Sequence, residues 1–477
     1  MKKVRLVLIS LLMFFAVTGC SNEDKNLLDK DDPTTIQVWH YYNGAQQEEF
    51  NRLVDEFNKT VGKEKGIIVE GSGQGTISDL ERNVLDSING KAGAADIPNI
   101  FAAYGDTAYQ VDKLGYAVDL NKYFSKDELS KYVDGYLEEG HFSSKDTLKI
   151  FPVAKSVELF MLNKTDWEKF ANATGASTND LNTIEGVTKV AEQYYNWTDD
   201  SLTAAPNDGK AFFGRDAFAN YMLVGYRQLA TDIFSKKDNK IVLNFEADIA
   251  KKLWDNYYVP YISGYFSSSG KFRSDDIKIG NILACVSSSS SVTYFPKEVI
   301  LNDEESHSIE LETFACPKFK DGKDYVVQQG AGMVVLKSEE KEQQAAVEFL
   351  KWFTSDKQNI AFSNASGYLP VTKSANDLDK ITDEVEVNES VKKTLNTSLK
   401  MISDNNMYTS VPFEKGTDAR NVLETTMSNL AKQDRETVIT NLSNGMNLEQ
   451  AISQFNNDTY FNQWYTNTKS QLESLIK

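Results

Sequence analysis

The sequence contains few of the residues that hold metal ions. Only three cysteines and three histidines occur among its 477 residues. The histidines, His40, His141 and His307, lie far apart, and no group of Cys and His residues has the spacing of a zinc site. The sequence gives no support for a structural metal, and we expect no cofactor.

Basic residues are also too few for a protein that binds nucleic acid. The chain has 51 Lys and Arg residues against 69 Asp and Glu residues, a net charge of −18. Because proteins bind nucleic acid through patches of Lys and Arg that neutralise phosphates, this balance argues against such a partner. The hydrophobic content of 41% over this length is enough for two lobes, each with its own core.

A hydrophobic run long enough to span a membrane is missing. The segment 6–17 is apolar apart from Ser10, but a spanning helix needs about 20 residues. Lys2, Lys3 and Arg5 precede this segment, which is the pattern of a secretory signal peptide over residues 1–19. Without these three of the 51 basic residues, the mature chain has 48 basic and 69 acidic residues, which is a net charge of −21.

The signal peptide ends at a cysteine. The sequence VTGC at 17–20 resembles the lipobox of bacterial lipoproteins, in which the thiol is lipidated and the chain is cleaved just before it. We expect palmitate-type acyl chains on Cys20, a polar tether over 20–33, and a protein held at the outer face of the cytoplasmic membrane. A cleaved signal peptide with an incidental cysteine is the alternative. Cys285 and Cys316 remain, either paired or free.

Strand and helix patterns alternate after the tether. Residues 35–39 and 66–70 read as strands, 50–57 and 77–88 carry apolar residues at helical spacing, and 97–105 reads as a buried third strand. This order predicts a parallel α/β sheet, in which ligands bind beyond the carboxyl ends of the strands. Candidate ligand contacts at those ends are Tyr41, Tyr42, Asn43, Gln74, Thr76, Tyr104 and Asp106.

Glycines before the second helix imitate a nucleotide-binding motif. Gly71, Gly73 and Gly75 precede this helix, but Thr76 stands where the third glycine of G-x-G-x-x-G belongs. The segment also follows the second strand, whereas the motif follows the first. We interpret these glycines as allowing close approach of the backbone to a ligand.

Several segments, in their order, carry a family resemblance. GAGMVVLK at 330–337 is followed by AAVEFLKWFT at 345–354 and GYLPV at 367–371, and VELFMLNKTDW and KIGNILACVSSSSS support them upstream. These segments resemble the extracellular solute-binding proteins of bacterial ABC importers, typified by maltose-binding and glycerol-3-phosphate-binding proteins. The resemblance implies an α/β, two-lobed periplasmic-binding-protein-like fold with a hinge and an interlobe cleft.

The same resemblance implies how the chain divides. The first lobe is expected to comprise residues 34–154 and to be completed by a return segment, 326–380. The second lobe is expected to comprise 155–325, with the C-terminal helices of 381–477 packed mainly on it.

The resemblance also carries site residues. Positions that match ligand contacts of the glycerol-phosphate subgroup are Tyr104, Ser156, one of Ser287 to Ser289 (we choose Ser288), Gly330 and Tyr368; Glu158, Asp216 and Arg420 are further candidates. Gly105 replaces an acidic residue of that subgroup, and Arg420 is slightly displaced from its expected place. These two departures argue against recognition of a phosphate. The tyrosines favour a sugar, because a sugar needs apolar faces and directional hydrogen bonds together.

The function implied is capture and delivery, without covalent chemistry. We expect a monomer that closes around a sugar or oligosaccharide and docks on two permease subunits driven by a cytoplasmic ATPase. The alternatives are a receptor for glycerol 3-phosphate or a glycerophosphodiester, a glycan-capture or sensing protein, and a glycosidase with two facing carboxylates. No G-x-S-x-G or H-E-x-x-H motif is present, so we do not expect an enzyme.

Overall fold

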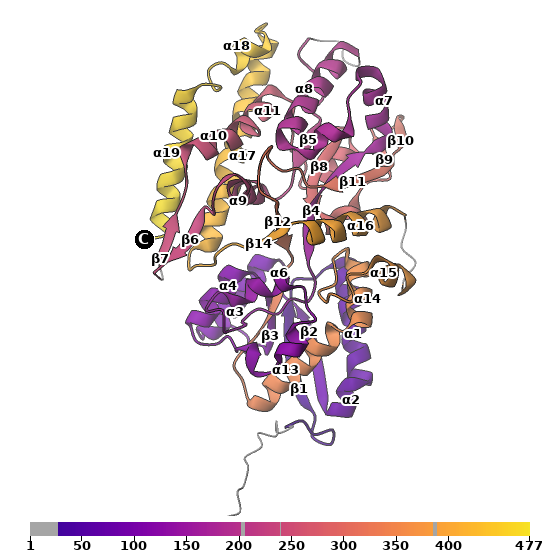
Figure 1. Ribbon diagram of the computed structural model, residues 1–477, viewed down its shortest axis with the longest axis vertical. Helices are drawn as coiled ribbons and strands as arrows, with labels where there is room; N and C mark the ends of the chain where they lie inside the picture. Colours follow the sequence, from indigo (N-terminus) through magenta and orange to yellow (C-terminus); the bar gives the residue numbers. More distant parts are fainter. Residues whose placement is uncertain (1–26, 202–205, 239, 385–388) are drawn as a thin grey trace, which may run out of the picture.

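The computed structural model describes residues 27–201, 206–238, 240–384 and 389–477. These form two lobes, one above the other in Figure 1, joined by segments that cross between them. The expected signal peptide and Cys20 lie outside the described residues. Among the helices of the described ranges, none is both long and apolar enough to cross a membrane.

The first lobe is built on a four-stranded sheet. Its strand order is β13-β3-β1-β2, with β1, β2 and β3 parallel and β13 antiparallel at the β3 edge. A strand from the 330s therefore completes a sheet begun near residue 34. The strands are β1 (Thr34–His40), β2 (Ile67–Gly73), β3 (Ile100–Ala103) and β13 (Gly332–Val335). The helices are α1 (Gly44–Lys59), α2 (Val61–Lys65), α3 (Ile77–Ile88), α4 (Gly105–Lys113), α5 (Lys126–Leu129), α6 (Asp134–Leu137), α13 (Glu340–Phe353) and α14 (Asp356–Ser366).

The helical spacing read from the sequence matches the packed face of α1. Its buried residues are Phe50, Leu53, Val54 and Phe57. The rings of Phe50 and Phe57 pack edge-on against α13, with 5.2 Å between the ring centroids of Phe57 and Phe349. Aromatic pairs in this geometry stabilise a core beyond their buried area. The core fixes α1 and α13 on the sheet and so holds the loops at the strand ends.

The second lobe contains a six-stranded mixed sheet. The order is β14-β12-β4-β8-β5, and β11 also pairs with β4. All eight residues of β4 are buried, because helices cover both of its faces. The strands are β4 (Ser156–Asn163), β5 (Phe213–Arg215), β8 (Ala284–Ser288), β11 (Leu311–Ala315), β12 (Tyr325–Gln329) and β14 (Asn406–Tyr408), with hairpins β6 (Phe234–Lys237) and β7 (Lys240–Leu243), and β9 (Glu298–Ile300) and β10 (Ser306–Ser308).

Helices from the middle and the end of the chain enclose this sheet. The long helix α17 packs along α11 and α9, and α19 packs along α17. The helices are α7 (Lys164–Thr174), α8 (Ile184–Ser201), α9 (Phe218–Leu229), α10 (Ala247–Asp255), α11 (Tyr258–Ser263), α12 (Arg273–Lys278), α17 (Gly416–Ser443), α18 (Leu448–Ile452) and α19 (Asp458–Leu475). Between the lobes lie α15 (Leu378–Glu384) and α16 (Glu389–Asp404).

The chain crosses between the lobes at a glycine. Strand β12 belongs to the second sheet and β13 to the first, so the crossing falls at Gly330 and Ala331. This is a few residues after the expected boundary at 325, because Gln328 and Gln329 still pair with β4. Gly330 has φ +93°, a left-handed conformation that glycine adopts without strain.

The two remaining cysteines are free thiols. Cys285 lies on β8 opposite Met161 of β4, and Cys316 follows Ala315, which pairs with Leu159 of β4 from the other side. Strands that flank a third are about 9.6 Å apart, whereas a disulfide needs Cα atoms within about 7 Å. The fold therefore separates the thiols by the width of β4.

We expect both thiols to stay unreacted in the folded protein. Burial, followed by the nearby Glu158, raises the pKa of the Cys316 thiol to about 12, so almost none is thiolate at pH 8. A thiol-reactive dye should label the mature chain, prepared from Asn22 without reductant, only after denaturation, and then at both cysteines. Cys285→Ser and Cys316→Ser should each leave one reactive thiol. No labelling after denaturation would contradict the separation.

Candidate ligand-binding site

Three tyrosines of the first lobe meet at its face toward the second lobe. Tyr41 follows β1, Tyr104 follows β3, and Tyr368 follows Gly367, the left-handed cap of α14. We call these three the tyrosine cluster. Burial, with the neighbouring phenols of Tyr104 and Tyr368, raises the pKa of Tyr41. Tyr104 is still 39% exposed, so the cluster presents a ring to solvent.

An arginine of the second lobe faces this cluster. Arg420 lies in the second turn of α17 and donates from Nη2 to Oδ1 of Asn220 at 2.6 Å. Gly416, one turn before Arg420 on α17, packs against Asp106, which follows Tyr104 by two residues, so Arg420 lies near the cluster. Burial raises the pKa of Tyr104, and the charge of Arg420 opposes the rise. Aromatic groups from one lobe and a cation from the other therefore border the same space.

A buried carboxylate lies beneath Arg420. Glu158, on β4, accepts from Asn220 Nδ2 at 2.8 Å through Oε1 and from Arg215 Nη2 at 3.0 Å through Oε2. Burial raises the pKa of Glu158, and Arg215, Asn220 and Arg420 oppose the rise. Because both of its oxygens already have partners within the lobe, Glu158 supports the site rather than presenting a free acceptor.

Asp106 joins the two lobes. It lies in the first turn of α4, and its Oδ1 accepts from the backbone N–H of Phe413, just before α17, at 3.1 Å. Gly416 packs directly against this carboxyl, since a Cβ there would lie 1.8 Å from Oδ1. Burial raises the pKa of Asp106 to about 6; the Phe413 N–H and Arg420 oppose the rise, and the acidic neighbours Glu81 and Glu139 add to it.

Comparison with known proteins identifies the family. The family model described as "Bacterial extracellular solute-binding protein" matches residues 52–389. The chain belongs to this family. Its members are binding proteins rather than enzymes, so the alternative that the chain is a glycosidase is wrong. No curated protein matches the sequence significantly.

Solved structures agree on the fold of this solute-binding protein. The cyclic alpha-maltosyl-1,6-maltose binding protein of Arthrobacter globiformis has a TM-score of 0.67 at 18% identity, covering 93% of this chain and 99% of its own. UgpB of Mycobacterium tuberculosis, in complex with glycerophosphocholine, has a TM-score of 0.68 at 15% identity and covers 93% and 100%. The expected two-lobed α/β fold is confirmed.

Three further candidates lie where the lobes of the solute-binding protein are joined. Ser288 donates to Ser156 Oγ at 3.0 Å, at the start of β4. The carbonyl of Gly330 accepts from Nζ of Lys155 at 2.8 Å, and this buried lysine is also paired with Glu139. A Cβ on Gly330 would lie 2.9 Å from the Tyr368 ring, so this junction adjoins the tyrosine cluster.

The other candidates do not lie in this group. Tyr42 is 6% exposed and packs in the first core against His40 and Phe362. Asp216 accepts from Ser287 Oγ at 2.8 Å and lies 3.5 Å from Nε of Arg273. Asn43 is exposed and precedes α1. The side chain of Gln74 hydrogen-bonds with Ser72 and Asn83. Thr76 forms the N-cap of α3 together with Asp79.

The glycine segment serves internal packing at one position. A Cβ on Gly71 would lie 2.8 Å from the Phe50 ring, so this glycine is required by the core and not by a ligand. Asn220, Lys155 and Glu139 were not predicted from the sequence. No local signal singles out Asn220, because α9 buries a second amide, Gln228, among its apolar residues.

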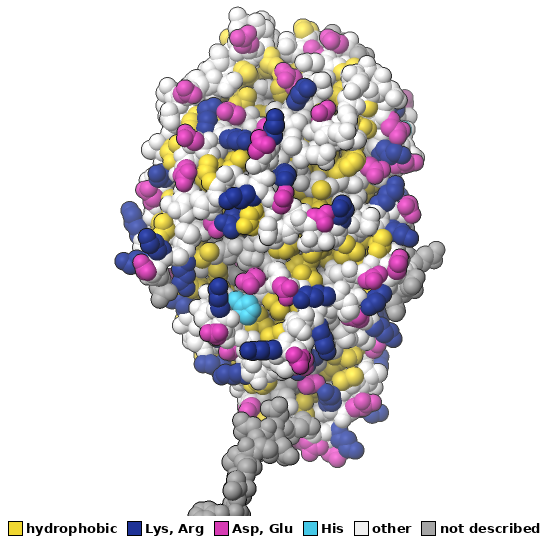
Figure 2. Space-filling view, viewed as in Figure 1, with side chains coloured by type: hydrophobic (Ala, Val, Ile, Leu, Met, Phe, Trp, Pro, Cys, Tyr) yellow, Lys and Arg dark blue, Asp and Glu magenta, His cyan; other side chains and the backbone are white. Residues whose placement is uncertain are grey.

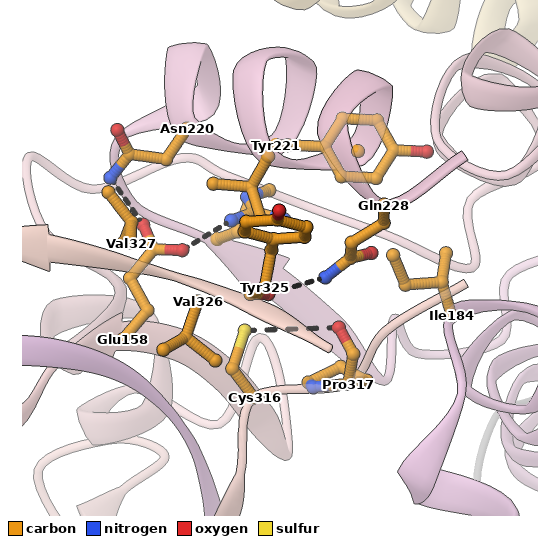
Figure 3. A pocket seen from close by; sticks show the side chains of 13 residues that line it. Glu158, Ile184, Asn220, Tyr221, Gln228, Cys316, Pro317, Tyr325, Val326 and Val327 are labelled. Carbon is orange, nitrogen blue, oxygen red and sulfur yellow. Dashed lines mark hydrogen bonds and ion pairs between the residues drawn. The ribbon is translucent and has the colours of Figure 1, made fainter. Parts of the chain in front are cut away.

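A small cavity lies behind the site, inside the second lobe (Figure 3). Its volume is about 20 Å³, and Glu158, Asn220, Cys316 and Tyr325 are among its lining residues. This volume holds about one water molecule. It is far too small for a sugar, so the space between the lobes remains the candidate site.

We expect ligand affinity to rise on acidification, because Asp106 takes up a proton when the lobes meet. A raised pKa favours the closed form most below the ordinary value of 3.8, and this advantage is lost as the pH rises through about 6. Titration calorimetry should show binding roughly tenfold tighter at pH 5 than at pH 7.

Asp106→Asn tests this linkage. The amide is neutral and still accepts from Phe413, so the variant should bind at pH 7 more tightly than the native protein does at pH 5, and without dependence on pH over this range. Glu81, Glu139 and Arg420 surround Asp106 and are unchanged in the variant. An identical pH profile in the variant would assign the effect to one of them instead.

Proposed function

We propose that this solute-binding protein captures a sugar or oligosaccharide between its lobes and delivers it to an ABC importer. The observation that carries the proposal is the tyrosine cluster facing Arg420 across the lobes, next to the contact of Asp106 with Phe413 and Gly416. Phenol rings offer flat apolar faces, while phenol and guanidinium groups offer directed hydrogen bonds, and a sugar requires both. On this proposal the ligand contacts Tyr41, Tyr104, Tyr368 and Arg420.

A second candidate ligand is a glycerophosphodiester. Arg420 favours it, because among the described residues no carboxylate lies within ion-pair distance of this guanidinium. A guanidinium that has no carboxylate partner can form charge-assisted hydrogen bonds with a phosphate. The similar structure from Mycobacterium tuberculosis holds glycerophosphocholine, which makes this ligand a necessary member of any test.

The remaining features of the proposal concern location and assembly. We propose lobes of 34–154 with 326–380 and of 155–325 with 381–477, except that residues 326–329 of β12 belong with the second lobe, whose sheet they join. We also propose a lipid anchor on Cys20 at the outer face of the cytoplasmic membrane, and a monomer that docks on two permease subunits with a cytoplasmic ATPase. On the face shown in Figure 2, Lys and Arg side chains are interspersed with Asp and Glu. The anchor is testable: an alkyne palmitate fed to cells should label the full chain but not Cys20→Ala.

The ligand can be identified with the mature chain, prepared from Asn22 onward. A thermal-shift panel of neutral oligosaccharides, glycerol 3-phosphate and glycerophosphocholine should give a shift with oligosaccharides, since ligand at 100 times its Kd stabilises the fold by about 2.7 kcal/mol. A shift with the phosphates alone would replace the proposal by the second candidate. No shift with any member would contradict both.

Variants of the tyrosine cluster locate the binding. Tyr104→Ala and Tyr368→Ala should each weaken the identified ligand about tenfold in titration calorimetry, because each removes an aromatic face from the site. Tyr123→Ala is the matched control, since Tyr123 is a partly buried tyrosine of the same lobe whose hydroxyl donates to Gln343. Equal losses in all three variants would indicate general destabilisation of the lobe.

A further inference from the structure

Four side chains form a continuous relay from the interlobe space into the second lobe. The relay runs from Arg420 on α17 to Asn220 on α9, then to Glu158 on β4, and ends at Arg215, the last residue of β5. Its three hydrogen bonds measure 2.6, 2.8 and 3.0 Å. Asn220 is 1% exposed, so only the Arg420 end reaches the space between the lobes. Figure 3 shows the Asn220 and Glu158 side chains pointing at each other.

The chemistry of the relay requires an amide at its centre. A guanidinium only donates hydrogen bonds and a carboxylate only accepts them, so the group between Arg420 and Glu158 must accept on one side and donate on the other. Asn220 does so, with Oδ1 toward Arg420 and Nδ2 toward Glu158. An aspartate would place a second carboxylate against Glu158, and an alanine would leave both neighbours without this partner.

A second contact fixes the two helices that carry the relay. Glu424, one turn after Arg420 on α17, accepts from the backbone N–H groups of Phe218 and Ala219 at 2.9 and 2.6 Å. These N–H groups belong to the first turn of α9, whose preceding residue, Ala217, has no capping side chain. Glu424 thus holds α17 against α9 and leaves Asn220 to set the direction of Arg420.

The other nitrogens of Arg420 are available. Within the described chain its guanidinium makes a single side-chain hydrogen bond, through Nη2, and none of its nitrogens is among the buried polar atoms without a partner. Nε and Nη1 therefore keep their donors for a group that enters between the lobes. A side chain held at one nitrogen loses less freedom when it binds a ligand through the others.

We infer that Asn220 is a positioning residue, which holds Arg420 at the interlobe site by linking it to the buried Glu158–Arg215 pair. The statement that Arg420 then meets the ligand rests on the proposed function. The statement that Asn220 holds Arg420 does not depend on the proposed function. The two statements are tested separately.

The first test needs no ligand. In nitrogen-15 spectra of arginine side chains at low temperature, the Nη protons of Arg420 should be resolved, because the bond to Asn220 hinders rotation of the guanidinium. Arg420→Lys assigns the signals by their loss. Asn220→Ala should collapse them, whereas Asn163→Ala, which removes an equally buried asparagine of the same lobe that caps α7, should leave them unchanged. Unchanged signals in Asn220→Ala would overturn the inference.

The second test uses whichever panel member the native protein binds. Asn220→Ala should weaken binding about tenfold in the native background and not at all in Arg420→Ala, since Asn220 acts only through Arg420. An equal loss in both backgrounds would show that Asn220 acts by another route and would overturn the inference. If the native protein binds no member, the proposed function fails, and the spectra alone still decide whether Asn220 holds Arg420.

Discussion

Replacing Glu158 with alanine is expected to destabilise the second lobe by about 3–5 kcal/mol. The side chain of Arg215 is only 6% exposed, and its Nε already has no partner in the structure. Without Glu158 this guanidinium would remain buried with no counter-charge, and Nδ2 of Asn220 would lose its acceptor. Breaking one half of a buried pair costs far more than the intact pair contributes, because the remaining charge is uncompensated.

Urea unfolding followed by tryptophan fluorescence measures this loss. Glu56→Ala is the control for an exposed pair, since its partner Arg52 is 52% exposed, and it should cost less than about 1 kcal/mol. The double variant Glu158→Leu with Arg215→Met should recover much of the stability, because it removes both charges together. A loss for Glu158→Ala no larger than that of Glu56→Ala would contradict the uncompensated charge as the cause.

Gly330→Ala is expected to cost about 3 kcal/mol and to weaken ligand binding. The backbone there has φ +93°, and a Cβ would lie 2.6 Å from the carbonyl oxygen of Ala154 and 2.9 Å from the Tyr368 ring. The left-handed backbone and the forced contact each cost on the order of 1–2 kcal/mol. Because the contact falls between the crossing segments, relief requires the lobes or the tyrosine cluster to shift.

Gly93→Ala separates the two causes. Gly93 has φ +82° but nothing within 4 Å of an added Cβ, so it should show only the backbone cost of about 1 kcal/mol and unchanged binding. Urea unfolding and titration calorimetry with the identified ligand supply both measurements. Equal losses in the two variants would mean that the contacts at Gly330 are relieved without cost.

Local patterns predicted the first lobe well. The spacing of Phe50 to Phe57 and of Ile77 to Ile88 defines α1 and α3, because amphipathic helices record in the sequence which face they bury. The strand β14 was not predicted, since three residues are too few to show a period. The position at which the chain crosses between the lobes was also not predicted. It depends on which of the two sheets β12 joins, and this pairing involves residues far away in the sequence.

The site was predictable only in part. Tyr41 and Tyr104 follow from the rule that ligand sites lie beyond the carboxyl ends of parallel strands. Tyr41 and Tyr42 were both predicted as ligand contacts, but successive residues of an extended chain point to opposite sides, and Tyr42 packs in the core. Asp106 next to Gly416, and Asn220 next to Arg420, are contacts between distant segments, and no local pattern records them.

The pairing of β13 with β3 also sets the order in which the chain can fold. Gly332 must reach Ala103 before the first sheet is complete, and the second lobe from β4 to β12 is synthesised in between. At a synthesis rate of about 5–20 residues per second, that wait is on the order of tens of seconds. Until then β3 has an open edge, and α13, which covers α1, has not yet emerged. The nascent first lobe therefore stays unfinished, and a chain in that state can still be threaded through a narrow translocation channel.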